Sequence, residues 1–150
     1  METAMKDQKS ELKFEQLILA AVRTTDNTPI YVDTQGFDAV SIYLQLGVGG
    51  ITFDATNKIE FKLYEANAAN GSDATPVAEA DIIGAPDDAE ATGIIRSLVA
   101  AHAAADDYWF GYRGSKRYVG LLADFSGTHG AGTAMAAAAV LGHPRNSPTA

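Results

Sequence analysis

The stretch that decides the fold runs from Asp107 to Pro148 and reads DYWFGYRGSKRYVGLLADFSGTHGAGTAMAAAAVLGHPRNSP. Two apolar runs, Tyr118–Phe125 and Ala134–Leu141, flank the glycine-rich segment SGTHGAGT, which suits neither a helix nor a strand. A turn at Arg113–Lys116 joins the first run to an aromatic one at Tyr108–Tyr112. Strand, tight turn, strand, glycine loop and strand together are typical of a meander in an antiparallel sheet. This stretch therefore predicts a β-sandwich of structural type rather than an enzyme.

Strict alternation of apolar and polar residues predicts two further strands. In FDAVSIYLQL (Phe37–Leu46) alternate residues from Val40 onward are apolar, and in KIEFKLYE (Lys58–Glu65) the second, fourth and sixth residues are apolar. A strand places such residues on one face, whereas a helix would spread them around its surface. A loop containing Asn-Gly then leads to Val77–Ile83, so the pattern predicts a hairpin between Lys58–Glu65 and Val77–Ile83.

The N-terminal part of the chain divides into an arm and two strands. Met1–Leu12 is polar and lacks a strand pattern, which predicts a flexible arm over residues 1–12 and a single domain over residues 13–150. Phe14–Val22 is the first apolar run, and it ends at the turn cluster TTDNTP. Ile30–Val32 is expected to form a short strand.

One region has two interpretations. In Gly84–Asp106 the acidic, turn-rich segment APDDAEAT precedes IIRSLVAAHAAADD, whose apolar spacing suits an amphipathic helix at Gly93–Asp106. A strand at Gly93–Leu98 followed by a surface excursion suits it equally, because periodicity alone does not separate short apolar runs. The whole chain then has seven or eight strands and little helix, which predicts an all-β, antiparallel, jelly-roll-like sandwich.

Composition narrows the classes of partner. The chain has 150 residues, 19 acidic and 11 basic side chains and a formal charge of −8. Phosphate backbones and anionic lipids repel such a chain, so neither nucleic acid nor a membrane is expected as a partner. No cysteine is present, which excludes disulfides and thiolate metal sites. No apolar stretch spans a bilayer and no signal peptide is recognisable, so synthesis in a cytoplasm is expected.

The histidines and the glycine-rich loop are the residues that come nearest to a chemical site. His102, His129 and His143 are widely separated, and a metal site built from them is less favoured than an exposed loop residue at His129 and a hydrogen-bonding strand end at His143. The loop SGTHGAGT lacks the lysine and the following helix that a phosphate site needs. Asp87, Asp88 and Glu90 could hold calcium, but a solvated acidic loop explains them better. No catalytic residue, cofactor or metal site is predicted.

The candidate interaction residues cluster around one turn. Arg113, Lys116 and Arg117 form the only dense positive group in an acidic sequence, and Tyr112 and Tyr118 flank it. A charged turn usually serves solubility, but this one could also dock onto an acidic partner. The nearby aromatic residues suit core packing on one strand face and an interface on the other better than a sugar-binding platform, and these include Tyr108, Trp109 and Phe110.

Taken in order, several segments resemble one family. These are FDAVSIYL, KIEFKLYE leading into TPVAEADIIG, YRGSKRYV, the loop FSGTHGAGT and the closing AVLGHPRNSP. From Phe14 to Pro148 the chain is similar to the capsid decoration, or cement, proteins of tailed bacteriophages. The resemblance rests on strand and turn patterns, not on an active-site signature.

The resemblance implies a non-enzymatic virion protein on the capsid exterior, made in the host cytoplasm. It implies a homotrimer on local three-fold axes that binds across boundaries of the major capsid protein. An alternative is a discoidin-like carbohydrate-binding or tail-associated adhesion module, because LYEANAANGSDATPV resembles a strand–loop–strand unit of such sandwiches. The absence of an aromatic residue from that loop counts against it.

Overall fold

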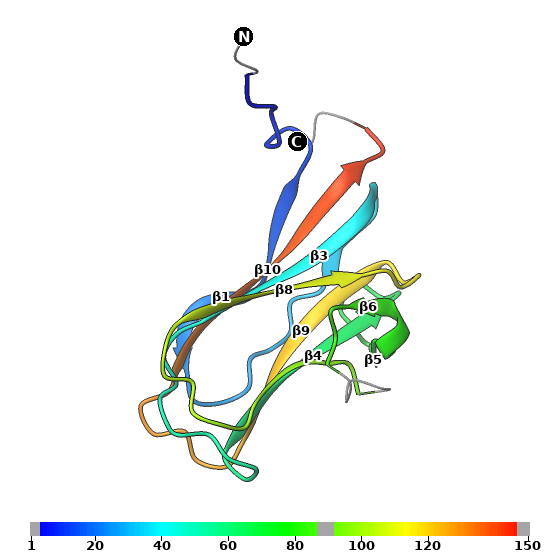
Figure 1. The fold of residues 1–150 in the computed structure, drawn as a ribbon. Coiled ribbons are helices and arrows are strands. Elements are labelled where there is room, and N and C mark those ends of the chain that lie inside the picture. The colour runs from blue at the N-terminus through cyan, green and yellow to red at the C-terminus, as the bar shows by residue number, and fades with distance from the viewer. Residues whose placement is uncertain (1–3, 87–91, 147–150) are drawn as a thin grey trace.

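A computed structural model describes residues 4–86 and 92–146, and nearly all of its regular structure is β. The elements are two packed antiparallel sheets and one short 3₁₀-helix, η1 (Figure 1). Their bounds in chain order are β1 Lys13–Arg23, β2 Val32–Asp33, β3 Phe37–Leu46, β4 Lys58–Ala66, β5 Thr75–Pro76, η1 Glu79–Asp81, β6 Ile82–Ile83, β7 Ile94–Leu98, β8 Asp106–Tyr112, β9 Tyr118–Ser126 and β10 Thr133–Pro144. The predicted all-β sandwich is confirmed.

The strands pair in a nested order. Sheet A has the order β1-β10-β3-β8-β6, and sheet B has the order β2-β9-β4-β5, with β7 also on β4. The first long strand thus pairs with the last, β2 with β9, β3 with β8, and β4 with β7. A chain folded back on itself as one long hairpin and then rolled into two sheets has this pairing, which is that of a jelly roll.

The core lies between the two sheets and is made by the alternation read from the sequence. Ile42, Leu44 and Leu46 of β3 and the apolar residues of β4 are buried there. Sheet A supplies further inward residues from β10, and sheet B supplies Val119 and Leu121 from β9. Successive side chains of a strand point to opposite faces, so these residues leave their neighbours on the outer faces of the sheets.

The predicted meander is wrong. β8 and β10 lie in sheet A while β9 lies in sheet B, so each connection in Asp107–Pro144 crosses from one sheet to the other. The three strands were correctly located, but their hydrogen-bonding partners are β3, β4 and β1, which come from the first half of the chain. Sequence neighbours are sheet neighbours in a meander, whereas a jelly roll pairs strands that are distant in sequence.

The predicted hairpin after β4 is also wrong beyond its first residues. Only Thr75–Pro76 pairs with β4, and the backbone N–H of Val77 donates to the carbonyl of Leu63 at 3.0 Å. The chain then turns through η1, and Ile82–Ile83 joins β8 in sheet A. Along the rest of this edge, β4 pairs instead with β7, Ile94–Leu98. Of the two interpretations of residues 93–106, the strand is therefore confirmed and the helix is wrong.

Side chains replace a missing strand at one edge of sheet B. β2 covers only Val119 and Tyr118 of β9. Farther along β9, the buried Asn27 donates from Nδ2 to the carbonyl of Leu121 at 3.0 Å and accepts at Oδ1 from the N–H of Ala123 at 2.7 Å. Asp26 accepts from the N–H of Phe125 at 2.7 Å. The segment between β1 and β2 thus satisfies backbone groups that would otherwise lose water without gaining a partner.

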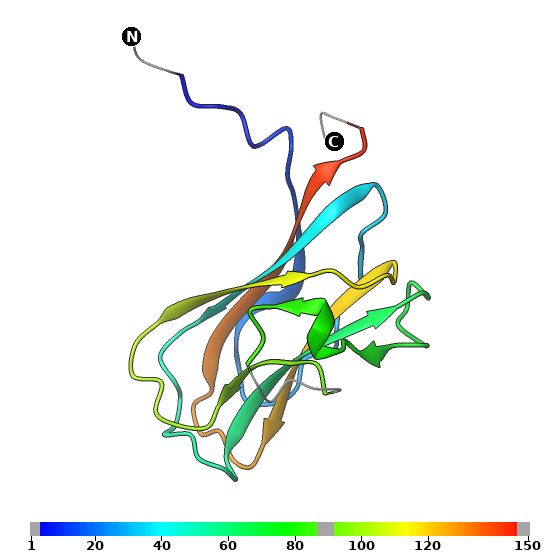
Figure 2. The same cartoon turned by 45° about the vertical axis from the view of Figure 1, so that its right-hand side comes forward.

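Both ends of the described chain leave the sandwich at the same end (Figures 1 and 2). The N-terminal segment makes a turn, in which the Ser10 hydroxyl donates to Asp7 at 2.6 Å and the N–H of Glu11 donates to Gln8. Leu12 then reaches the outer face of sheet A, because a methyl group on Gly142 would lie 3.2 Å from it. The flexibility expected for residues 1–12 stays a prediction.

Candidate interaction surfaces

The basic turn predicted as a docking site is already engaged within the chain. Arg117 donates from Nε and from a terminal nitrogen to the two carboxylate oxygens of Asp33, at 2.9 and 2.7 Å. The hydrogen bond from this guanidinium holds the pKa of Asp33 below its usual range. The guanidinium carbon also lies 5.2 Å from the centre of the Tyr118 ring. Both groups are about half exposed, so the pair adds little stability but reduces the positive charge that Arg117 offers to a partner.

The other residues of this turn line an open groove of about 520 Å³ at the end of the sandwich. Arg113 donates from Nε to the carbonyl of Ala80 at 2.9 Å, and Arg145 on the opposite wall pairs with Asp38. Lys116 is the third basic residue of the turn, beside Arg113 and Arg117. Arg117 and Arg145 each pair with an aspartate, so the turn and its groove form a surface of mixed charge.

Tyr112 is buried at the base of this groove. Its hydroxyl donates to the carboxylate of Glu65 at 2.7 Å. Burial, and then the hydrogen bond to the carboxylate, raise the pKa of Tyr112 above its usual value. The residue thus joins β8 of sheet A to β4 of sheet B, and it is structural rather than available to a partner.

Replacing Tyr112 with phenylalanine tests this role. We expect Y112F to lower the free energy of unfolding by about 1 kcal/mol at neutral pH, because the hydrogen bond to Glu65 is lost. The pKa of Tyr112 is raised above the value of about 10 of an unfolded tyrosine, so its contribution is full below about pH 10 and is lost as the pH rises further. Urea unfolding of both proteins from pH 8 to 11 should therefore show their difference shrinking above about pH 10. A constant difference across the range would contradict this role.

The histidines lie apart, and the described residues contain no group of three or more His, Cys, Asp or Glu that could hold a metal ion. His129 is not the exposed loop residue that was predicted, since only 3% of it is accessible. Its Nε2 donates to the carbonyl of Ser126 at 2.8 Å, and its ring packs edge-on against Phe125 and near Phe53. His129 thus holds the glycine-rich loop that follows β9 against the core. His143 lies exposed at the end of β10, and the acidic cluster at 87–90 falls outside the described residues.

A second groove, of about 530 Å³, lies between β7 and the neighbouring part of β8. Arg96 stacks on the ring of Tyr108, 4.1 Å from its centre, and also donates to its hydroxyl at 3.1 Å. His102 links the same hydroxyl at 3.0 Å to the carbonyl of Gly47 at 2.9 Å. Trp109 and Asp107 line the outer side of the groove, so it combines aromatic and polar groups.

A further candidate surface is the outer face of sheet A. Strand register defines it, because residues directly opposite each other share a face. Trp109 of β8 lies opposite Tyr43 of β3, Tyr43 lies opposite Ala138 of β10, and Ala138 lies opposite Gln16 of β1. The rows on either side of this one are built in the same way. By this register, the outer face comprises Phe14, Gln16, Val22, Ala39, Ser41, Tyr43, Gln45, Ile83, Asp107, Trp109, Gly111, Ala134, Ala136, Ala138, Val140 and Gly142.

This outer face is almost uncharged. Asp107 is its one ionisable carboxylate, and a hydrogen bond from Tyr43 engages it and raises the pKa of that tyrosine. Antiparallel sheets that face water on one side normally carry polar residues there. In a chain with 30 acidic and basic side chains, their near absence from one broad surface makes this face a candidate interaction surface.

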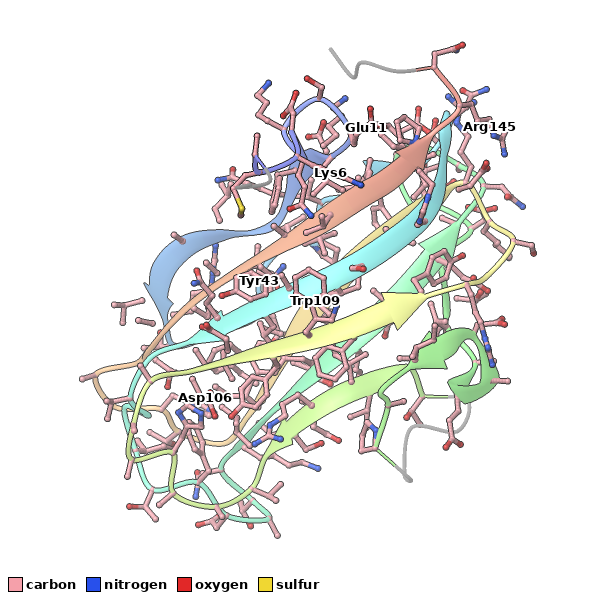
Figure 3. The ribbon with its side chains drawn as sticks, turned by 45° about the horizontal axis from the view of Figure 1, so that its top comes forward. Lys6, Glu11, Tyr43, Asp106, Trp109 and Arg145 are labelled. Carbon is pink, nitrogen blue, oxygen red and sulfur yellow. The ribbon has the colours of Figure 1, made fainter. Side chains whose placement is uncertain are left out.

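The outer face of sheet A has raised and hollow parts as well as an unusual composition. Tyr43 and Trp109 form an aromatic ridge, with their ring centres 5.8 Å apart in an edge-on arrangement, and 61% of Trp109 is exposed. Beside the ridge, Ala134 and Ala136 of β10 line a shallow trough of about 450 Å³. Figure 3 shows Tyr43 and Trp109 in the middle of the sheet, while Lys6, Glu11, Asp106 and Arg145 lie toward its ends. An apolar centre with charged residues at its rim is the usual anatomy of a protein interface.

Sequence reasoning found only part of this surface. The aromatic run of β8 was predicted to form part of an interface and Ala134–Leu141 to form a strand, but neither was connected with Tyr43 and Phe14. The alternation of apolar and polar residues in β3 already indicated that Tyr43 faces away from the core. Only the register, which is not visible in the sequence, places Tyr43 between Trp109 and Ala138.

Among the described residues no helix is long and apolar enough to cross a membrane. Comparison of the chain with models of protein families, with curated proteins and with solved structures gave no match.

Proposed function

We propose that this protein is a structural subunit that decorates and stabilises the capsid of a tailed bacteriophage by binding across boundaries of the major capsid protein. The observation that carries the proposal is the uncharged outer face of sheet A, with its exposed Trp109 and its charged rim. Such a surface favours a function that is performed by contact with another protein. The resemblance of Phe14–Pro148 to capsid decoration proteins supplies the identity of the partner and the expected homotrimer.

The fold is compatible with the proposal but does not decide it. Jelly rolls occur in viral capsid proteins and also in lectins and cupins, so the argument from fold is one of analogy. A decoration subunit needs only modest contacts, because a specific interface of about 800 Å² per partner is repeated over many copies on one shell. The mixed-charge groove at Arg113–Arg117 offers a second surface, at which Lys116 could meet an acidic loop of the shell.

The test adds purified protein to expanded capsid shells that lack it. We expect saturable binding and a higher rupture temperature of the shells on heating. Ala136→Glu puts a charge on the outer face, opposite Gln45 and away from the core, and it should weaken binding at least about tenfold if this face is used. Val99→Glu changes an exposed apolar residue beyond β7, so it serves as the matched control. Absence of binding by the wild-type protein would refute the proposal.

The second candidate is a carbohydrate-binding or adhesion module, and the groove at Arg96, Tyr108, Trp109 and Asp107 favours it. Sugars bind to proteins by stacking on aromatic rings and by hydrogen bonding to neighbouring polar groups, and this groove offers both. A glycan array with the wild-type protein and with Trp109→Ala tests it. Selective binding that W109A abolishes, together with no affinity for shells, would place this function first.

A further inference from the structure

The relief of the outer face of sheet A is self-complementary. The ridge of Tyr43 and Trp109 stands on β3 and β8, and the trough lined by Ala134 and Ala136 lies along the neighbouring β10. If a second copy is set against the first and displaced by about one strand spacing, ~5 Å, the ridge of one copy meets the trough of the other. A single surface then supplies both halves of a contact, as symmetric self-assembly requires.

Charge also favours a second copy of this chain as the occupant. Each copy carries a formal charge of −8, so most surfaces of two copies repel each other. The outer face brings only Asp107 from each copy into the contact, and that carboxylate is already hydrogen-bonded to Tyr43. Lys6 lies toward one end of the face and Asp106 toward the other, so the two could meet across the contact if the copies run in opposite directions (Figure 3).

The area of the face is close to the lower limit for a specific contact. Four strands at ~4.8 Å spacing, and a length from Ala134 to Gly142 at ~3.4 Å per residue, give roughly 600 Å² per copy. Specific interfaces bury about 800 Å² per partner, and the smallest stable ones bury about 600 Å². The N-terminal segment extends the surface at one end, because Gln8, Glu11 and Leu12 line a groove with Trp109 and Val140.

We propose that copies of this chain associate through the outer face of sheet A, with the Tyr43–Trp109 ridge of one copy seated in the β10 alanine trough of the next. A face that supplies both halves of its own contact pairs two copies about a two-fold axis, so this contact is separate from the homotrimer of the proposed function and does not rest on that proposal. It predicts that free protein associates in the absence of any capsid.

The chain provides its own probe, because Trp109 is its single tryptophan. We expect sedimentation to show a mass above the 15.8 kDa of one chain at micromolar concentration. Over the same concentration range, the tryptophan emission should shift to shorter wavelength and acrylamide quenching should fall, since Trp109 becomes covered. Ala136→Glu, which retains the tryptophan, should weaken association at least about tenfold. Val99→Glu should associate like the wild type, and circular dichroism of both variants should confirm that they fold.

The outcomes separate this inference from the proposed function. Association without a change in tryptophan emission would place the contact elsewhere and overturn the inference. A monomer whose emission shifts only when shells are added would also overturn it, while supporting a capsid contact at the same face. Association through the face by a protein that does not bind shells would support the inference and refute the proposed function.

Discussion

Replacing Asn27 with alanine is expected to lower the free energy of unfolding by about 2 to 4 kcal/mol. The side chain is 94% buried and spans the gap between β2 and the far end of β9. Its removal leaves the carbonyl of Leu121 and the N–H of Ala123 without partners, and each such buried group costs about 1 to 3 kcal/mol. In a domain of this size the melting temperature should fall by roughly 5 to 15 °C.

Asp26→Ala is the matched control for that prediction. Asp26 makes the same kind of bond to the same strand, at the N–H of Phe125, but it is exposed, so water replaces the lost acceptor. We expect a loss of about 1 kcal/mol or less. Urea unfolding of N27A and D26A, measured side by side, gives the comparison of their stabilities. Equal effects of N27A and D26A would show that Asn27 does not act as a surrogate for a strand.

The second large effect is expected at Gly93, immediately before β7. Gly93 has a φ of +69°, and a methyl group there would overlap the carbonyl oxygen of Leu63, which accepts the hydrogen bond of Val77. The left-handed conformation costs an alanine about 1 to 2 kcal/mol, and overpacking adds about 1 to 3 kcal/mol. Gly93→Ala should therefore destabilise the protein by about 3 kcal/mol or more and should loosen the pairing of β7 with β4.

Gly36→Ala separates the two causes. Gly36 also has a positive φ, +93°, but a methyl group there meets no atom within 4 Å. It should cost only the conformational term of about 1 to 2 kcal/mol. Thermal unfolding of both variants gives the comparison, and amide hydrogen exchange in Ile94–Leu98 should increase in G93A alone. If the two variants were equally stable, the steric argument at Leu63 would fail.

The amino-acid sequence by itself determined where the longer strands lie and which of their residues face inward. Phe37–Leu46 coincides with β3, Lys58–Glu65 lies within β4, and the apolar set of each is buried. This success has a local cause. Successive side chains of a strand point to opposite faces, so a period of two in hydrophobicity identifies the strand and its buried face without reference to any other segment.

The tertiary structure alone decided which strands are neighbours. Backbone hydrogen bonds between strands are the same for every residue type, so nothing in Tyr118–Ser126 specifies β4 rather than the adjacent β8 as its partner. The jelly-roll order depends on how both sheets bury their apolar faces at once. The burial of His129, the bridging role of Asn27 and the continuous face shared by Trp109, Tyr43 and Ala138 all follow from that order. A local pattern determines which side of a strand is apolar, but the candidate site exists only because distant strands are brought into register.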